Sequence, residues 1–370
     1  MENELTQEQS VMKETARLFA SKSLRPGAEQ FDDMGAPYPD GWMDQAGDLG
    51  FMNMMAPPEL GGVGCGTFDA GLVIEELSAG CAGMAAGVVA SLAGLMTVLN
   101  SGAPKQMLER LLLEPHEKDP RGFRVSAAGL FRTPFRVEAE GTVSGAEKGV
   151  LGLEKAQWCA VAAREGDGTS CWVVPTRCEG VHVSQMRNTL GIRAANPGEI
   201  KIDKVEGDRM GAVDTDVVLA LTSTLLAAAA VGCARAALDD AIDYARERYQ
   251  GCDMIVKHDT VAHMILSNRA RIDAARSRIH ALMKQNDAAI NPKTGSIDGK
   301  IDVNASLLAR TFAMDAALQA TLDAVQCHGG YGYMHDFPVE KRLRDARSLG
   351  VIFGTNPELL TYMKPSLGND

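Results

Sequence analysis

The sequence lacks the features that mark several classes of protein. Its eight cysteines include no CxxC pair and its seven histidines form no cluster at metal-ligand spacing, so we expect no metal site. The first residues lack the basic start and apolar run of a signal peptide, which predicts reduced thiols in a cytoplasmic protein. Because 48 acidic residues outnumber 37 basic ones, giving a net charge of −11, the composition disfavours nucleic acid or an anionic membrane as a partner.

Aromatic residues are also scarce, at 5% of 370 residues, whereas 38 glycines and 18 methionines are present. This composition favours closely packed helices over a sheet-dominated protein. One stretch, residues 217–234, carries no charge over 18 residues, which is the lower limit for a membrane span. Hydroxyl side chains and a run of alanines interrupt it, so we expect a buried bundle helix and no membrane span.

The hydrophobic pattern divides the chain into three parts, which predicts an α+β fold. Residues 1–119 form an N-terminal helical domain, which opens with a capping box at Thr6-Gln-Glu-Gln9. After a charged, proline-flanked linker at Glu114–Pro120, short apolar runs in residues 120–213 indicate a central antiparallel sheet or barrel. Residues 214–370 are predicted to form an antiparallel four-helix bundle.

Two adjacent carboxylates, Glu75 and Glu76, lie on a predicted helix of the first domain. Neighbouring helix positions diverge by about 100°, so the two side chains cannot converge on one substrate atom as an acid/base pair. We therefore expect a solvated or salt-bridged helix face.

A glycine pair, Gly329 and Gly330, ends the last long helical pattern. Such a pair is typical of a left-handed helix cap followed by a turn, and on spacing alone this interpretation is favoured. Glycines also lack a Cβ atom, so a ligand could approach their amides closely. Both interpretations stay open at the level of local spacing.

The motifs around this glycine pair, taken together, resemble those of a known family. The motif QxxGGxGY (Gln326 to Tyr333), followed by Arg344-Asp-Ala-Arg347 and then Gly354-Thr-Asn356, resembles the C-terminal signature of the acyl-CoA dehydrogenase family. Other motifs follow in the family's order: Pro58-Glu-Leu-Gly-Gly-Val-Gly64, Ile74-Glu-Glu-Leu77, Leu190-Gly-Ile-Arg193 and Tyr244-Ala-Arg-Glu-Arg248. The resemblance implies the three-domain fold described above. It also implies α,β-dehydrogenation of an acyl-CoA thioester with FAD, and an electron-transferring flavoprotein as the usual electron acceptor.

The sequence departs from the family at the catalytic base. The resemblance implies a glutamate immediately before the Gly-Thr turn, and this chain has Phe353 there. Phenylalanine has no proton acceptor, and a positioned base contributes about 10² to 10⁴ in rate. The alternative position of the base in the family matches Leu221-Thr-Ser-Thr224, which also lacks a carboxylate. We therefore predict no catalytic residue in this chain.

A second departure concerns the flavin ring. The segments that match the family's flavin-lining motifs are Ala127–Pro134 and Gly149–Leu153, and they lack the expected hydroxyl groups and the expected aromatic side chain. Apolar replacements leave polar flavin atoms unpaired, which disfavours binding. The chain's own flavin pocket is therefore predicted to be degraded.

The residues that the family donates to a neighbouring subunit's FAD are still present. Arg248, Gln326, Gly329 and Gly330 match the groups that hold the adenine and pyrophosphate end of that FAD. A guanidinium and backbone amides suit a diphosphate. The alternative for Arg248 is a solvated helix residue that pairs with Asp243 or Glu247.

These observations predict one subunit of a hetero-oligomeric acyl-CoA dehydrogenase, paired with a related subunit that carries the base and the intact flavin pocket. Two alternatives are a self-sufficient acyl-CoA-binding flavoenzyme with a relocated base and a non-catalytic structural homologue. The sequence does not identify the acyl group.

Overall fold

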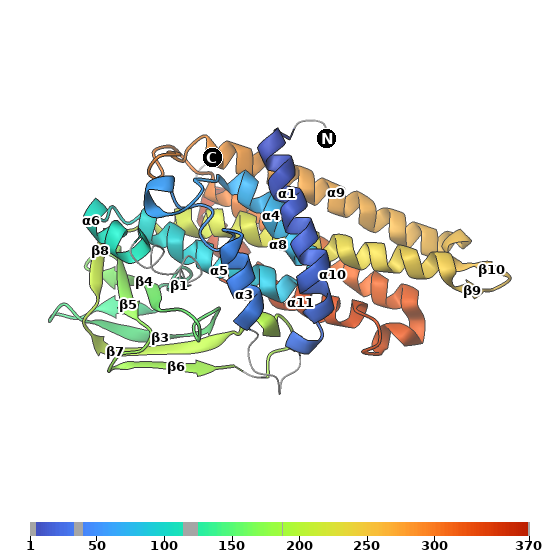
Figure 1. Ribbon diagram of the computed structural model, residues 1–370, viewed down its shortest axis with the longest axis horizontal. Helices are drawn as coiled ribbons and strands as arrows, with labels where there is room; N and C mark the ends of the chain where they lie inside the picture. The colour runs from blue at the N-terminus through green and yellow to red at the C-terminus, as the bar shows by residue number, and fades with distance from the viewer. Residues whose placement is uncertain (1–4, 33–39, 114–124, 187, 369–370) are drawn as a thin grey trace.

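The structure is a computed structural model that describes residues 5–32, 40–113, 125–186 and 188–368. The predicted linker Glu114–Pro120 and the predicted boundary between residues 119 and 120 lie outside these residues. Helices precede and follow a central sheet, which confirms the predicted α+β fold class (Figure 1).

The N-terminal part consists of helices and short helical turns. The first helix, α1 (Gln7–Phe19), begins with the predicted capping box: the Thr6 hydroxyl accepts the Gln9 N–H at 3.2 Å, and the Thr6 N–H donates to the Gln9 side chain at 3.0 Å. The elements that follow are η2 (Ala20–Leu24), α2 (Arg25–Gly27), η3 (Gln30–Asp32), α3 (Asp40–Asp48), η4 (Pro58–Leu60), α4 (Thr67–Gly80), α5 (Ala82–Leu99), α6 (Lys105–Leu108) and η5 (Glu109–Leu113).

The central part is an eight-stranded sheet that differs from the prediction in one respect. Seven strands follow the spatial order β6-β7-β3-β2-β4-β5-β8, and β1 pairs with β4 off this path. Most pairs are antiparallel, but β4 runs parallel to both β1 and β2, so the sheet is mixed rather than antiparallel throughout. The strands are β1 (Val125–Ala128), β2 (Phe135–Val137), β3 (Val143–Val150), β4 (Trp158–Glu165), β5 (Gly168–Pro175), β6 (Val181–Gln185), β7 (Gly198–Val205) and β8 (Asp208–Ala212), with the turn η7 (Arg193–Ala195) before β7.

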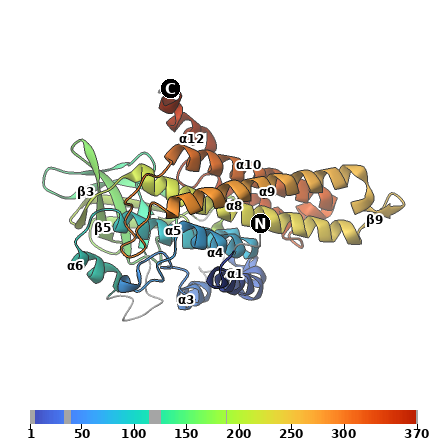
Figure 2. The same ribbon diagram turned by 90° about the horizontal axis from the view of Figure 1, so that it is seen from above.

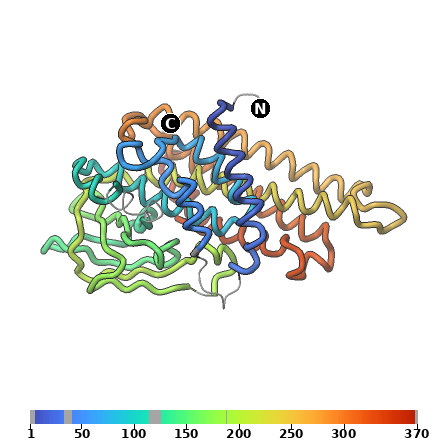
Figure 3. The backbone as a smooth tube through the Cα atoms, viewed as in Figure 1, coloured from blue at the N-terminus to red at the C-terminus, as the bar shows by residue number. Residues whose placement is uncertain are grey.

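The C-terminal part is built on three long helices, α8 (Thr215–Glu247), α9 (Asp259–Asp287) and α10 (Val303–His328), which lie side by side (Figures 1 and 2). The connection between α8 and α9 projects beyond the end of the bundle (Figure 3). It contains the small hairpin β9 (Tyr249–Gln250) and β10 (Asp253–Met254) and the turn η8 (Ile255–Lys257). The remaining elements are η9 (Gly329–Tyr333), α11 (Val339–Leu349), α12 (Asn356–Tyr362) and η10 (Lys364–Gly368).

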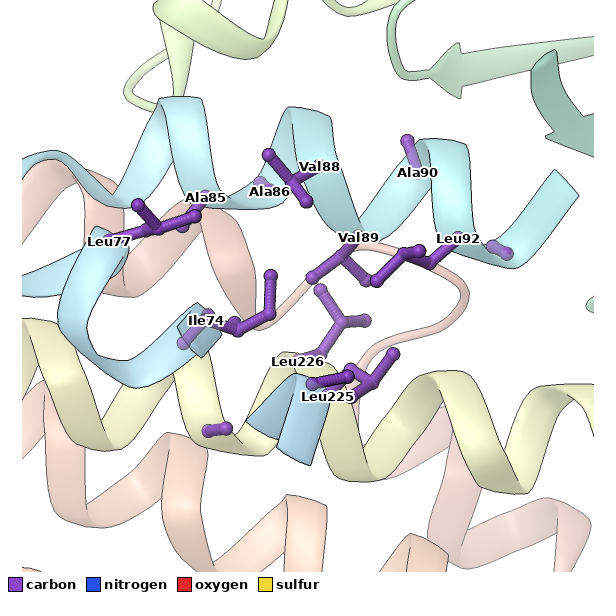
Figure 4. Close-up of a cluster of buried hydrophobic side chains, with 14 of the residues drawn as sticks. Ile74, Leu77, Ala85, Ala86, Val88, Val89, Ala90, Leu92, Leu225 and Leu226 are labelled. Atoms are coloured by element: carbon purple, nitrogen blue, oxygen red, sulfur yellow. The ribbon is translucent and has the colours of Figure 1, made fainter. Parts of the chain in front are cut away.

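The main core lies where α4, α5 and α8 meet (Figure 4). Ile74 and Leu77 of α4 face Val89 of α5 and Leu225 and Leu226 of α8, and all five are almost fully buried. Two helices, α5 and α8, are long and apolar enough to cross a membrane, but 100% and 94% of their most apolar windows are buried inside the protein. The apolar stretch of α8 is therefore a buried bundle helix, as its composition predicted.

The start of α4 is held by a side chain from the end of α9. Asp287 accepts the N–H of Thr67 at 2.5 Å and the N–H of Phe68 at 3.0 Å, so it satisfies the free amides of a helix whose own N-cap residue is glycine. A Cβ atom at Gly66 would lie 2.5 Å from the Asp287 carboxyl carbon, so only glycine permits this contact. Burial raises the pKa of Asp287, and these hydrogen bonds oppose the rise.

The two glutamates of α4 form a buried ion network, which confirms a salt-bridged face and excludes a solvated one. Arg276 of α9 binds Glu75 at 2.5 Å, and Arg235 of α8 binds Glu76 at 2.7 Å. Burial alone would raise the pKa of Glu75, but the hydrogen bond from His280 and the charges of Arg276 and Arg235 lower it to about 2. The network joins the N-terminal helices to the C-terminal bundle.

Replacement of Glu75 by glutamine should therefore destabilise the protein. A pKa that falls from 4.5 to about 2 on folding corresponds to about 3 kcal/mol of stability at pH 7. This contribution is complete above the unfolded pKa and is lost as pH falls towards the folded pKa, so the deficit of the variant should begin to shrink below about pH 5. Urea unfolding at pH 7 and pH 4 measures both effects. The matched control is Glu14→Gln, which breaks an exposed pair with Arg17 and should change stability little; equal losses in the two variants would contradict the network's role.

Candidate active site and cofactor half-site

A cavity of about 550 Å³ lies between the sheet and the C-terminal helices, and we call it the junction cavity. Its walls come from the end of β3, the segment before η7, the end of α11 and the turn before α12. The lining residues used below are Phe131, Glu147, Gly149, Leu151, Thr189, Arg347 and Phe353. Most of the remaining wall is apolar, so the few polar groups determine which ligands fit.

Phe353 lies in the wall of the junction cavity, where the family resemblance places the base. Its side chain is half-buried and packs on the cluster of Leu219, Leu307, Leu359 and Met363. Its backbone has φ 51°, a left-handed conformation that is uncommon for a bulky residue, and Gly354 follows with φ 101°. The turn therefore brings an apolar ring, without a proton acceptor, to this wall.

Arg310 of α10 holds this turn from behind. Its guanidinium is fully buried and donates to the carbonyl groups of Ile352, Phe353 and Gly354, the last at 2.9 Å. It also donates to the Ser223 hydroxyl at 3.4 Å, so the two segments that could carry a base in the family meet at one buried cation. Among the described residues no carboxylate pairs with Arg310, and burial lowers its pKa to about 9.

The segments that the resemblance matches to flavin-lining motifs, Ala127–Pro134 and Gly149–Leu153, both contribute to the wall of the junction cavity. Gly149 and Leu151 line the junction cavity and offer neither an aromatic ring nor a hydroxyl group. The backbone N–H of Gly129 is already engaged, because it donates to the Glu147 carboxyl at 2.6 Å. The Glu147 carboxyl group thus accepts the hydrogen bond of the Gly129 amide, which directly follows the last residue of β1.

Glu147 is the unexpected titratable group of the junction cavity. Burial raises its pKa to about 7, and the Gly129 N–H opposes that rise by stabilising the carboxylate. Lys148, its neighbour on β3, pairs instead with Glu199 at 3.8 Å. Glu147 therefore exchanges its proton near neutral pH beside the wall that Phe353 forms.

A second cavity of about 550 Å³ lies at the far end of the helical bundle, and we call it the bundle-end cavity. It brings together three of the four predicted donor residues: Arg248, Gly329 and Gly330 all line it. Arg248 follows α8, is exposed, and lies over the ring of Tyr331 at 5.8 Å. A Cβ atom at either glycine would meet nothing within 4 Å, so the surface at this turn is open.

The pairing alternative for Arg248 is wrong. Asp243 pairs with Arg246 at 3.9 Å, whereas the contacts of Arg248 are the Gln250 side chain at 3.4 Å and Tyr331. Among the described residues, Arg248 has no carboxylate partner. Its guanidinium is therefore available to an anion.

Gln326 does not join the other three residues in this cavity. Its side chain is exposed on the last turn of α10, and it is not part of the cavity lining. Its carbonyl accepts the N–H of Gly329, so that amide is used in ending the helix and is not available to a ligand. Gly329 has φ 58°, and its contribution is close approach rather than hydrogen bonding.

The other residues of the C-terminal signature have structural roles. His328 is buried, its Nδ1 lies 2.8 Å from the Ala324 carbonyl, and its ring stacks on Tyr244 at 4.3 Å. Asp345 binds Lys341 at 2.5 Å and accepts the N–H of Ile192 at 2.6 Å across the domain junction. Arg344 pairs with Asp32 and Glu340 in the same region, whereas Arg347 points away from this cluster and lines the junction cavity.

The two cavities differ in how well they fit FAD. The bundle-end cavity offers a guanidinium, which can bind a diphosphate, and an open glycine turn, which lets that group approach the backbone closely. The junction cavity has the volume for an aromatic ring system, but its donor chemistry does not match: the Gly129 N–H is engaged and Leu151 has no hydroxyl. The residues present therefore fit the phosphate end of FAD and do not fit its ring.

Comparisons with known proteins agree on one family. The family models described as the N-terminal and C-terminal domains of acyl-CoA dehydrogenase match residues 6–112 and 213–362. Cyclohexane-1-carbonyl-CoA dehydrogenase of Geobacter metallireducens is 28% identical over 95% of both chains. A protein of Mycobacterium leprae named as a probable acyl-CoA dehydrogenase is 30% identical, over 95% of this chain and 93% of that one.

A solved structure gives the same fold. The structure of an acyl-CoA dehydrogenase of Bacillus anthracis complexed with FAD superimposes with a TM-score of 0.85 at 19% identity, covering 99% of this chain and 68% of that one. Three-part architecture, matched motifs and relatives all coincide along nearly the whole chain. The chain belongs to the acyl-CoA dehydrogenase family of oxidoreductases.

Sequence reasoning missed Glu147, which lines the junction cavity, and Arg310, which lies behind its wall. Glu147 lies on a strand between exposed positions and has no motif of its own, so its contact with Gly129 depends on how β3 packs beside β1. Arg310 is a lone basic residue among apolar residues of a long helix. That pattern alone could have indicated a buried cation.

The titration of Glu147 is a direct test of this geometry. Carbon-13 NMR of labelled carboxyl groups should show one glutamate with a midpoint near pH 7, and Glu147→Gln should remove that resonance. Glu138 is an internal reference, because the hydrogen bond from Arg136 lowers its pKa below the usual range. A Glu147 midpoint close to 4.5 would show that the carboxyl is open to water and contradict the structure.

Proposed function

We propose that this chain is one subunit of a hetero-oligomeric acyl-CoA dehydrogenase, which carries out α,β-dehydrogenation of an acyl-CoA thioester with FAD. The partner is a related subunit that supplies the catalytic base and an intact flavin pocket. This chain lacks the base and completes the partner's FAD site with its bundle end. The cofactor is thus shared across the subunit interface.

One observation carries the proposal: the chain keeps the residues that a partner's FAD needs and lacks those that its own FAD needs. Arg248 and the glycine turn are open to an anion at the bundle-end cavity. The junction cavity instead presents Phe353 and a carboxyl that occupies the Gly129 amide. This asymmetry is what a division of labour between two related subunits produces.

The chemistry assigned to this chain is binding and positioning. FAD, when bound, would supply the acceptor for the β-hydrogen of the acyl thioester, and the partner's base would take the α-proton. Arg248 would hold the diphosphate through a forked, charge-assisted contact, and Gly329 with Gly330 would let that group lie close to the backbone. Phe353 can neither take nor return the α-proton.

The proposal extends to the setting of the reaction. Acyl-CoA is the substrate of the assembled enzyme, and an electron-transferring flavoprotein is the acceptor that the family relationship favours. The same proposal includes a cytoplasmic location.

The flavin content of the purified protein tests the shared site. The chain alone should carry little FAD, and co-purification with the related partner should give about one FAD per pair, read from the visible spectrum. In the complex, Arg248→Ala should release most of the flavin, because a charge-assisted bidentate contact to a phosphate is lost. Arg246→Ala is the matched control: it removes an exposed arginine two residues earlier on α8, which pairs with Asp243, and should leave flavin content unchanged.

Other results would reject the proposal in distinct ways. Stoichiometric FAD and acyl-CoA oxidation by the chain alone would establish a self-sufficient enzyme. A complex that stays colourless with its partner would favour a non-catalytic homologue.

A self-sufficient acyl-CoA-binding flavoenzyme with a relocated base is the second candidate, and Glu147 is the observation that favours it. Its carboxyl lines the same cavity as Phe353 and has a pKa of about 7, which suits proton transfer near neutral pH. In that case Glu147→Gln should lower kcat of the isolated chain by about 10² to 10⁴, while Glu138→Gln should leave it unchanged. Equal activity of the wild type and Glu147→Gln would exclude this base.

A further inference from the structure

The junction cavity combines apolar walls with few uncompensated charges. Two of its basic side chains are paired: Arg132 binds Glu358 at 3.0 Å, and Lys148 binds Glu199 at 3.8 Å. Arg347 lines the cavity and, among the described residues, has no carboxylate partner. A free guanidinium therefore faces the cavity of a protein whose net charge is −11.

A second uncompensated cation lies directly behind the wall. Arg310 donates to the carbonyl groups of Ile352, Phe353 and Gly354, and all three of these residues line the cavity. Its charge is fully buried and unpaired among the described residues, so little solvent screens it. Both cations favour a negative charge inside the cavity.

One hydroxyl group in the wall also lacks a partner. Thr189 Oγ1 is buried without a hydrogen bond, while its carbonyl accepts the side chain of Arg193 at 2.9 Å. A buried hydroxyl without a partner is costly. Because this oxygen has almost no accessible surface, it does not count among the groups that contact a ligand in the cavity.

Glu147 opposes an anion when it is ionised. Within the part of the chain that the structure describes, its one hydrogen-bond partner is the Gly129 N–H at 2.6 Å. The titratable or charged groups around it, strand by strand and helix by helix, are Lys148 on β3, Glu199 and Lys201 on β7, Cys159 on β4, Arg132 after β1, Arg347 on α11 and Glu358 on α12. Since Lys148 and Arg132 are already paired, protonation of Glu147 removes the one unpaired negative charge of the wall.

We propose that the junction cavity binds an amphipathic organic anion, a compound with an apolar body and one carboxylate-like or sulfonate-like head, and that binding requires a neutral Glu147. The inference rests on the proposed function in one respect, that this chain's own cavity does not carry FAD. The apolar wall receives the body of the ligand. Arg347 and the field of Arg310 favour the head.

The fluorescent probe 8-anilinonaphthalene-1-sulfonate has this chemistry, and its sulfonate stays ionised at all working pH values. Titration of the full chain at constant ionic strength should show saturable binding that is about tenfold tighter at pH 6 than at pH 8, because one group with a pKa of about 7 must gain a proton. N-phenyl-1-naphthylamine has a similar body without the charge, and its affinity should not change with pH.

Variants identify the groups responsible. Glu147→Gln should bind the sulfonate tightly at both pH values, whereas Glu138→Gln, which follows β2 outside the cavity lining, should keep the tenfold pH dependence. Arg347→Ala should weaken sulfonate binding by about threefold, as expected for an exposed charge pair, and leave binding of the neutral probe unchanged.

The outcomes separate this inference from the proposed function. If the purified chain contains one FAD per chain, both fail. If it is free of flavin and binds the charged and neutral probes equally, or if Glu147→Gln keeps the wild-type pH dependence, only the anion site is rejected. Loss of the pH dependence in Glu147→Gln together with weaker binding in Arg347→Ala supports it.

Discussion

The close packing of α8 against its neighbours is the constraint on which the rest of the structure depends. Four consecutive alanines, Ala227–Ala230, are buried in its middle turns, and a Cβ atom at Gly232 would lie 2.1 Å from the Glu75 carbonyl. The backbones of α4 and α8 therefore approach to a distance that larger side chains would prevent. Because α8 also contacts α5, α9 and α10, this one interface places the N-terminal helices relative to the bundle.

The length of α8 also separates the two cavities. Ser223, near its start, contacts the arginine that holds the wall of the junction cavity, while Arg248 follows its last residue. Their separation of 25 positions corresponds to about 38 Å at 1.5 Å per residue. A group at one end therefore cannot touch a small ligand at the other, so a substitution at one cavity need not affect ligand contacts at the other.

Much of the fold could be predicted from local sequence patterns, whereas the candidate functional site could be predicted only in part. The helical domains, the capping box at Thr6 and the buried character of α8 are set by periodicity and side-chain chemistry within short windows. The position of Phe353 and the grouping of Arg248 with Gly329 and Gly330 came from the family resemblance, and the structure brings these three together.

The remaining features depend on contacts between segments that are distant in the sequence. Glu147 reaches the Gly129 amide only because β3 and the end of β1 lie side by side, and Arg310 reaches three carbonyl groups of a turn more than forty residues later. The parallel pairing of β4 with β1 and β2 also depends on contacts between distant segments. The alternation of apolar and polar residues along one strand does not show the direction of its neighbours. The Gln326 side chain lies outside the bundle-end cavity, which a motif cannot reveal because it does not specify which side of the last helical turn faces a cavity; its contact with a partner's FAD stays a prediction.

The cap that Asp287 provides to α4 has a consequence for the order of synthesis. The acceptor is made 220 residues after the amides that it satisfies, so α4 leaves the ribosome with its first turn open to water. The N-terminal helices can collapse early, but their central helix acquires its final start only when α9 has been translated and has docked. The N-terminal domain therefore reaches its final structure only after the C-terminal domain has been synthesised as far as Asp287. A nascent chain that stalls before this residue exposes α4 as an uncapped, largely apolar helix.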